Sequence, residues 1–96
     1  MQAATEIIAI NTPAIKARIQ EIIANVTSID PASIDDAASF TADLDLDSLS
    51  LLEIGVDVDY EFQLGLPEER MRGIDSVEQT VALVEERIRE KQAEVA

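Results

Sequence analysis

Ser48 stands directly after an acidic run, in the stretch DLDLDSLS at residues 43–50. Asp47 is a residue type that caps helix N-termini, so Ser48 falls in the first turn of the helix that we expect to follow. A phosphate attached to a hydroxyl at such a position meets unpaired backbone N–H groups and the positive end of the helix dipole. The position therefore suits a serine that carries a phosphodiester. An ordinary structural serine at a helix start is the alternative, and position alone favours it.

The sequence offers no partner that could activate this serine as a nucleophile. It contains no histidine and no cysteine, which excludes a Ser-His pair, an imidazole base, a disulfide and a thiolate metal site. A chain of 96 residues forms one modest domain and lacks room for a deep enzyme cleft with its scaffold. We therefore expect a non-catalytic protein whose serine is acted upon by another enzyme.

Charge is segregated along the chain. The formal net charge is -13, and all seven Lys and Arg lie outside residues 19–69, a window rich in Asp and Glu. Such a surface disfavours nucleic acid and anionic membrane as partners and favours a basic protein surface. An acidic coat that only keeps the domain soluble is the alternative, but the segregation favours a docking surface.

No apolar run is long enough to span a bilayer, and the first residues lack the basic start and cleavable apolar core of a signal peptide. We therefore expect a cytoplasmic protein with no stable membrane insertion. Aromatic residues make up only 3% of the chain, so the core must be aliphatic.

Four helices are predicted, with no strand pattern to compete. The first begins with Thr12 as N-cap and Pro13 at its first position, and its apolar face is Ile15, Ile19, Ile22, Ile23 and Val26. A long loop to residue 47 follows, with Ile34, Phe40 and Leu44 as core anchors. A second helix starts at Ser48, and a short third one follows Pro67. The last begins with Asp75 as N-cap and Glu78 as its capping-box partner, and frays beyond Arg89.

The predicted second helix is apolar on two opposite sides. At about 100° per residue, one side carries Leu51, Ile54, Val58 and Phe62, and the other carries Leu49, Leu52, Val56 and Tyr60. A domain this small can bury only one side, so we expect the other to stay partly exposed as a contact surface. Cover by neighbouring helices on both sides is the alternative. Gly55 in mid-helix costs about 1 kcal/mol relative to alanine.

The order and spacing of these features resemble an acyl carrier protein. The resemblance covers about residues 13–88 and rests on DLDLDSLSLLEI, on Phe40 upstream, on FQLGLP downstream and on IDSVEQTVALVEERI at the end. It implies an all-α four-helix bundle of acyl-carrier type, with a long loop between helices 1 and 2 and a short third helix. Residues 12–91 would form the carrier domain, with 1–11 as an extension, helical or frayed, and 92–96 as a frayed tail.

The resemblance also implies a function. Ser48, flanked by Asp47 and Leu49, would carry 4'-phosphopantetheine, attached from coenzyme A by a phosphopantetheinyl transferase that supplies the Mg²⁺. The arm would hold acyl groups as thioesters and present them to enzymes of fatty-acid, polyketide or specialised lipid biosynthesis. The carrier would work as a monomer, with no metal site and no catalytic residue of its own.

Two surfaces follow from the same resemblance. The helix after the serine would be recognised by acyltransferases, ketosynthases or acyl-ligases with basic surfaces, through Leu49, Leu52, Glu53, Val56, Asp57 and Glu61. Its other side would help to line an acyl-chain cavity formed by Leu51, Ile54, Val58, Phe62, Ile74 and Val81.

The sequence departs from the family pattern in two places. Asp45 stands where the family usually has glycine, three positions before the serine, and Gly55, Val56 and Asp57 replace a more strongly helix-forming run. These departures favour a discrete carrier of a specialised polyketide or lipid pathway over the general fatty-acid carrier.

Three other functions stay open at this point. One is a peptidyl-type carrier, and another is an acidic interaction module without the arm. The third is calcium binding, because Asp43, Asp45 and Asp47 match the first ligands of an EF-hand loop. That loop needs glycine at its sixth position and glutamate at its twelfth, where this chain has Ser48 and Ile54, so the sequence disfavours calcium binding through this motif.

Overall fold

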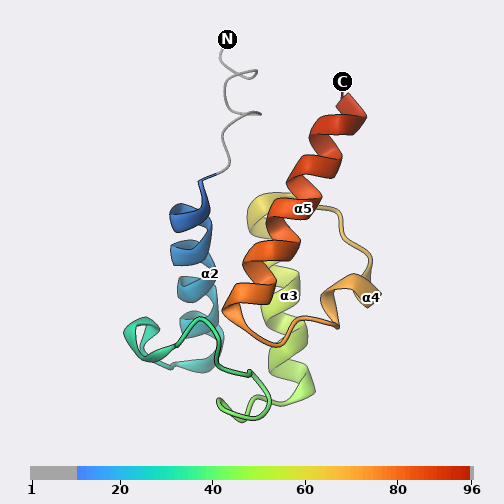
Figure 1. Ribbon diagram of the computed structural model, residues 1–96. Helices are drawn as coiled ribbons and strands as arrows, with labels where there is room; N and C mark the ends of the chain where they lie inside the picture. The colour runs from blue at the N-terminus through green and yellow to red at the C-terminus, as the bar shows by residue number, and fades with distance from the viewer. Residues whose placement is uncertain (1–10, 96) are drawn as a thin grey trace.

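The computed structural model describes residues 11–95 (Figure 1). This part of the chain contains four α-helices and one short 3-10 turn, joined by loops. In chain order they are α2 (Thr12–Thr27), η1 (Pro31–Ser33), α3 (Ser48–Phe62), α4 (Glu68–Met71) and α5 (Val77–Val95). The predicted all-α bundle, with its long loop before α3 and its short α4, is confirmed. The extension predicted at residues 1–11 lies, except for Asn11, outside the described residues. Within residues 11–95 no helix combines the length and apolar character needed to cross a membrane.

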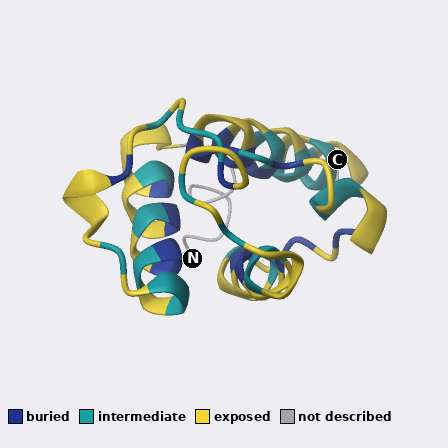
Figure 2. Cartoon of the chain, turned by 90° about the horizontal axis from the view of Figure 1, so that it is seen from below, coloured by how far each residue is buried: buried dark blue, intermediate teal, exposed yellow. Residues whose placement is uncertain are grey.

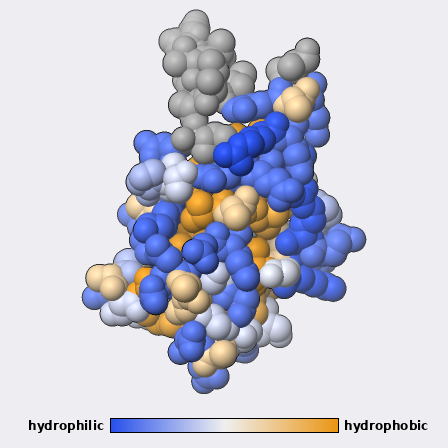
Figure 3. All heavy atoms as spheres, in the orientation of Figure 1, coloured by the Kyte–Doolittle hydropathy of each residue, from blue (hydrophilic) through white to orange (hydrophobic). Residues whose placement is uncertain are grey.

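The three long helices enclose an aliphatic core. Helix α2 packs against both α3 and α5, and the buried residues line the sides where these helices face one another (Figure 2). In the view of Figure 3 hydrophobic residues reach the surface mainly in the seam between α2 and α5. The core consists of Ile15, Ile19, Ile22, Ile23, Ile34, Phe40, Ile54, Val58, Leu64, Leu66, Val77, Val81 and Val84. Two predicted loop anchors, Ile34 and Phe40, are thus buried, and the third, Leu44, is half-buried.

Two predicted N-caps are wrong by one residue. Helix α2 is capped by Asn11, whose side chain accepts a hydrogen bond from the Ala14 N–H at 3.1 Å, because asparagine is at least as good a cap as threonine. The Thr12 hydroxyl instead donates to the carboxylate of Glu85 on α5. That side-chain bond ties α2 to α5 near the start of α2.

Helix α5 is capped by Ser76 and not by Asp75. The Ser76 hydroxyl accepts from the Gln79 N–H at 3.1 Å, and the Gln79 side chain accepts from the Asp75 N–H at 2.7 Å. This is a capping-box-like exchange one residue later than predicted, with Gln79 in the role expected of Glu78. The Asp75 carboxylate therefore does not cap α5 and can bind the long loop instead.

The end of α5 also differs from the prediction, because the helix continues past Arg89 to Val95. Ion pairs tie this last part of the helix to its surroundings. Glu90 accepts from Arg70 at 2.9 Å and from Arg87 at 3.2 Å, and Glu94 accepts from Arg87 at 3.3 Å. These contacts hold residues that apolar periodicity alone would leave to fray.

Asp75 fastens the long loop to the start of α5. Its carboxylate accepts from the hydroxyls of Ser39 at 2.5 Å and Thr41 at 3.1 Å and from the Thr41 N–H at 3.2 Å. Its carbonyl accepts from the Phe40 N–H at 2.7 Å. Phe40 is thereby held in the core, and the Phe40 carbonyl accepts in turn from the Leu46 N–H at 2.9 Å, two residues before α3.

These contacts predict an acid-sensitive fold. The hydrogen bond from the Ser39 hydroxyl holds the pKa of Asp75 below its ordinary value of 3.8, because it stabilises the ionised carboxylate. A pKa that is lower in the folded than in the unfolded state stabilises the fold above the ordinary pKa, and this contribution is lost as the pH falls through the folded-state value. We expect Asp75→Asn to lower the thermal midpoint at neutral pH and to flatten its fall on acidification, measured by circular dichroism. Asp35→Asn, which removes an exposed charge from the same loop, serves as control, and parallel pH curves for wild type and Asp75→Asn would contradict this assignment.

Candidate functional site

Ser48 is the first residue of α3 and is exposed. The helix starts there because Asp47 caps it, as predicted: the Asp47 carboxylate accepts from the Ser50 N–H at 2.8 Å and its carbonyl from the Leu51 N–H at 3.1 Å. The Ser50 N–H bond also lowers the pKa of Asp47 below its ordinary value of 3.8, so the cap stays ionised near neutral pH. The Ser48 hydroxyl thus stands at the solvent-facing, positive end of a helix dipole.

The acids before Ser48 do not converge on a metal site. The Asp43 carboxylate accepts from the Ser39 N–H at 2.7 Å, and the Asp47 carboxylate is engaged with Ser50. Across residues 11–95 no three His, Cys, Asp or Glu side chains come close enough together to hold a cation. Of the carboxylates of Asp43, Asp45 and Asp47, the first accepts a hydrogen bond from the loop backbone and the last from the backbone of α3.

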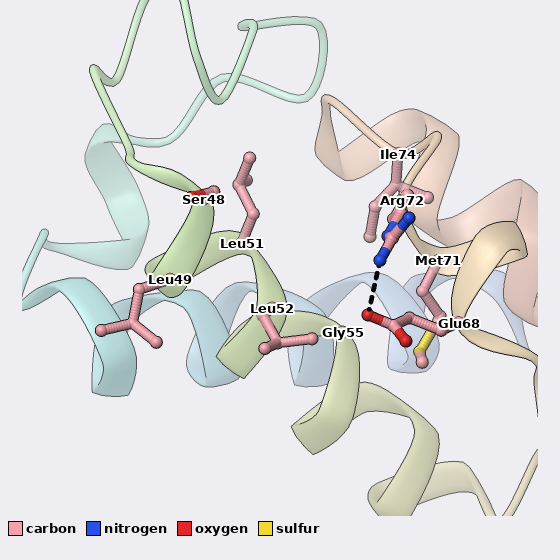
Figure 4. Close-up of a pocket in the computed structure, with 9 residues that line it drawn as sticks. All are labelled: Ser48, Leu49, Leu51, Leu52, Gly55, Glu68, Met71, Arg72 and Ile74. Atoms are coloured by element: carbon pink, nitrogen blue, oxygen red, sulfur yellow. Dashed lines mark hydrogen bonds and ion pairs between the residues drawn. The ribbon is translucent and has the colours of Figure 1, made fainter.

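A pocket of about 550 Å³ opens beside Ser48, between α3 and the segment that contains α4 (Figure 4). Its walls are largely apolar, and the only charged groups among its lining residues are Glu68 and Arg72, which form an ion pair at 3.0 Å. The lining residues are Ser48, Leu49, Leu51, Leu52, Gly55, Glu68, Met71, Arg72 and Ile74. A chain attached to Ser48 would therefore have an apolar surface next to its point of attachment.

The structure brings together only part of the set predicted for an acyl-chain cavity. Leu51 and Ile74 line the pocket, whereas Ile54, Val58 and Val81 are buried in the closed core and Phe62 packs against it. Four lining residues were assigned to no site by the sequence: Gly55, Glu68, Met71 and Arg72. The glycine in mid-helix was the available signal, because a missing side chain inside a helix often marks a close approach by another element.

The side of α3 that faces away from the core is exposed, as predicted, and two of its residues, Leu49 and Leu52, also line the pocket. The exposed fractions are 65% for Leu49, 45% for Leu52, 50% for Val56 and 77% for Tyr60. We call Leu49, Leu52, Val56 and Tyr60, with the exposed acids Glu53 and Asp57, the outer face of α3.

The acids of α3 differ in how far they are neutralised. Glu53 and Asp57 take part in none of the ion pairs found among the described residues. Glu61, at the far end of the helix, pairs with Arg18 of α2 at 3.0 Å. Glu53 and Asp57, near the middle of α3, therefore keep their negative charge uncompensated by an ion pair within the described residues.

Asp45 has a left-handed backbone, with φ = 57°. The other described non-glycine residues with positive φ, Ser28 and Gln63, end α2 and α3 as C-caps. Asp45 lies within the loop instead, three residues before Ser48. Left-handed geometry favours glycine, and aspartate is among the few other residues that adopt it at low cost.

The region that contains Ser48 matches a known protein family. The family described as "Phosphopantetheine attachment site" matches residues 17–84. The meromycolate extension acyl carrier protein of Mycobacterium tuberculosis is 39% identical over 80 residues, which cover 83% of this chain and 69% of that protein.

Two further relatives come from other bacteria. An acyl carrier protein of Rhodococcus erythropolis is 35% identical over 69 residues, covering 72% of this chain and 76% of the relative. The polyketide-8 synthase acyl carrier protein 2 of Streptomyces avermitilis is 38% identical over 69 residues, covering 72% of this chain and 79% of the relative.

The backbone of Asp45 predicts an unusual order of stability among variants at this position. Asp45→Gly should raise the free energy of unfolding by up to about 1 kcal/mol, because glycine adopts positive φ without a Cβ penalty. Asp45→Val should lower it by about 1 kcal/mol or more. Asp45→Asn keeps the tolerance for this geometry and removes the charge, so it isolates the electrostatic part. Urea unfolding measures all three, and a valine variant as stable as the glycine variant would contradict the left-handed assignment.

Proposed function

The chain belongs to the acyl carrier proteins that bear a phosphopantetheine attachment site, and on that basis we propose that Ser48 carries the 4'-phosphopantetheine arm. The supporting observation is the position of Ser48: it is exposed at the start of α3, lies within the matched residues 17–84 and borders the pocket. When attached, the arm supplies the thiol that holds an acyl group as a thioester.

The residues around Ser48 fit such an arm. Ser48 is exposed, and the first turn of α3 offers backbone N–H groups and a positive dipole end to a phosphodiester. Arg72 is the one basic residue that lines the adjoining pocket. Leu51, Met71 and Ile74 provide apolar walls that can exclude water from a bound chain.

Attachment needs a base from outside the chain. The nearest acid in sequence, Asp47, is ionised but committed to the Ser50 N–H at 2.8 Å. A phosphopantetheinyl transferase would therefore take the proton from the Ser48 hydroxyl as that oxygen attacks the β-phosphate of coenzyme A and the adenosine 3',5'-bisphosphate leaves. This division of labour makes the chain a carrier and the transferase the catalyst.

We further propose that the outer face of α3 is the surface that partner enzymes recognise. It combines exposed apolar side chains with Glu53 and Asp57, two acids without an ion-pair partner among the described residues. A basic, partly apolar surface on the transferase, on acyltransferases, on ketosynthases or on acyl-ligases complements it. Of the three acids that the sequence predicts for recognition, Glu61 contributes less to the attraction than Glu53 and Asp57, because Arg18 already neutralises it.

The names of the relatives support a specialised pathway. One relative is named for meromycolate extension and another for a polyketide synthase. We propose that this chain serves, as a discrete monomeric carrier in the cytoplasm, the synthesis of a specialised lipid or a polyketide, with residues 12–91 as the carrier domain.

The arm can be tested by mass. Incubation with coenzyme A, Mg²⁺ and a broad-specificity phosphopantetheinyl transferase should add one phosphopantetheine to the apo wild type, and none to Ser48→Ala, as measured by intact-mass spectrometry. Ser50→Ala, two residues on in the same helix turn, is the matched control and should be modified like wild type. A gain on Ser48→Ala would move the attachment site elsewhere. No gain on any variant, including with transferases from the protein's own source, would favour an acidic interaction module without the arm.

The outer face of α3 can be tested by charge reversal. Glu53→Lys and Asp57→Lys should each slow arm attachment at low salt by roughly tenfold, because they replace attraction to a basic partner by repulsion. The effect should shrink as added salt screens the charges. Asp35→Lys, a reversal in the exposed loop, should have little effect, and circular dichroism should show all three variants folded. Rates equal to wild type at low salt would mean that this face is not the recognition surface.

A further inference from the structure

Gly55 of α3 and Met71 of α4 meet in the wall of the pocket beside Ser48. A Cβ placed on Gly55 would lie 3.4 Å from both Cβ and Sδ of Met71. The missing side chain at residue 55 thus leaves a slot in α3 that the thioether of Met71 borders, and Figure 4 labels both residues in the wall of the pocket. Both residues line the pocket, so this contact forms part of its wall.

The slot does not arise from any demand of the α3 backbone. Gly55 has ordinary helical geometry, since Gly65 is the only described glycine with positive φ. A methyl group at residue 55 would meet Met71 at ordinary contact distance, so alanine would fit there. Alanine would also favour the helix by about 1 kcal/mol. The glycine thus leaves room next to Met71 at a cost in helix stability.

The rest of this wall is anchored. The residues that flank α4, Leu66 and Ile74, are buried, and the Leu66 N–H donates to the Asp59 side chain at 3.0 Å. From the other side of α4, Arg70 donates to both carboxylate oxygens of Glu90 on α5, at 2.9 and 3.3 Å. The backbone of α4 is therefore held at both ends and against α5.

Met71 is the part of the wall that can yield. Its side chain is half-buried, and methionine is unbranched, with three rotatable bonds and a polarisable sulfur that adapts to irregular gaps. Turning the thioether away from the slot would lengthen the pocket along α3 without moving the α4 backbone. A Cβ at residue 55 would lie only 3.4 Å from Met71, so the space between them suits an unbranched aliphatic chain.

We propose that Met71 and Gly55 together set the length of the linear acyl chain that this carrier shields. In the unloaded carrier the thioether closes the slot beside Gly55 from the side of α4. A chain long enough to reach Met71 displaces it and takes its place, whereas a shorter chain leaves it in position. This inference rests on Ser48 being the residue that bears the arm.

The test loads wild type, Met71→Ala and Gly55→Ala with butanoyl, octanoyl and dodecanoyl arms from the corresponding acyl-coenzyme A, and measures the rate at which hydroxylamine cleaves each thioester. Met71→Ala should protect the longer chains more than wild type does, by about fourfold for each further methylene shielded. Gly55→Ala should protect them less, because its methyl group narrows the slot. Butanoyl, the shortest chain, should be cleaved alike in all three, because the proposal has short chains leave Met71 in position. Val56→Ala, on the outer face, is the matched control and should behave as wild type.

The outcomes separate this inference from the proposed function. Gly55→Ala should be at least as stable as wild type, so its loss of protection could not come from unfolding. Equal cleavage rates for every chain length in wild type and both variants would overturn the role of Met71 and leave the arm on Ser48 intact. Failure of every variant to accept an arm would overturn the assignment of Ser48, and this inference with it.

Discussion

Asp75 fixes the long loop before α3 to the start of α5, and the fold and the site both depend on this contact. It binds the backbone or hydroxyl groups of Ser39 and Thr41, while its own carbonyl fixes the Phe40 N–H. These bonds place Phe40 in a core that has few other aromatic side chains, and they close the long loop against the start of α5. This loop leads directly into Asp47 and Ser48. The position of Ser48 therefore depends on the hydrogen bonds that Asp75 forms with the loop.

The sequence predicts well what depends on periodicity. Isoleucine spacing in α2, the two faces of α3 and the valines of α5 follow from the packing of aliphatic side chains at helical intervals, and all three helices are present. The caps at Asn11 and Ser76 were each missed by one residue, because each stands next to another residue of a type that commonly caps helices, Thr12 or Asp75. Which of the two is used depends on side-chain contacts such as those of Thr12 with Glu85 and of Asp75 with the loop.

The pocket was less accessible to sequence reasoning. Helical angles correctly put Ile54 and Val58 on the inner side of α3, but they do not tell a closed core from an open pocket. That distinction depends on where α4 lies, and α4 is a single short helix placed by Leu66, Ile74 and the Arg70–Glu90 ion pair. None of these contacts has a periodic signature. The same reasoning explains why Met71, on a segment without pattern, was missed.

The placement of the basic residues has an effect on how the molecule moves. Every charged residue of α3 and of the loop before it is an acid. The basic residues lie elsewhere, on α2, on or next to α4, and on α5: Lys16, Arg18, Arg70, Arg72, Arg87, Arg89 and Lys91. The protein is consequently an electric dipole as well as an anion. In the field of a basic partner it experiences a torque that turns α3 towards that partner before the two surfaces touch, and this narrows the rotational search that otherwise limits how often a diffusional encounter is productive.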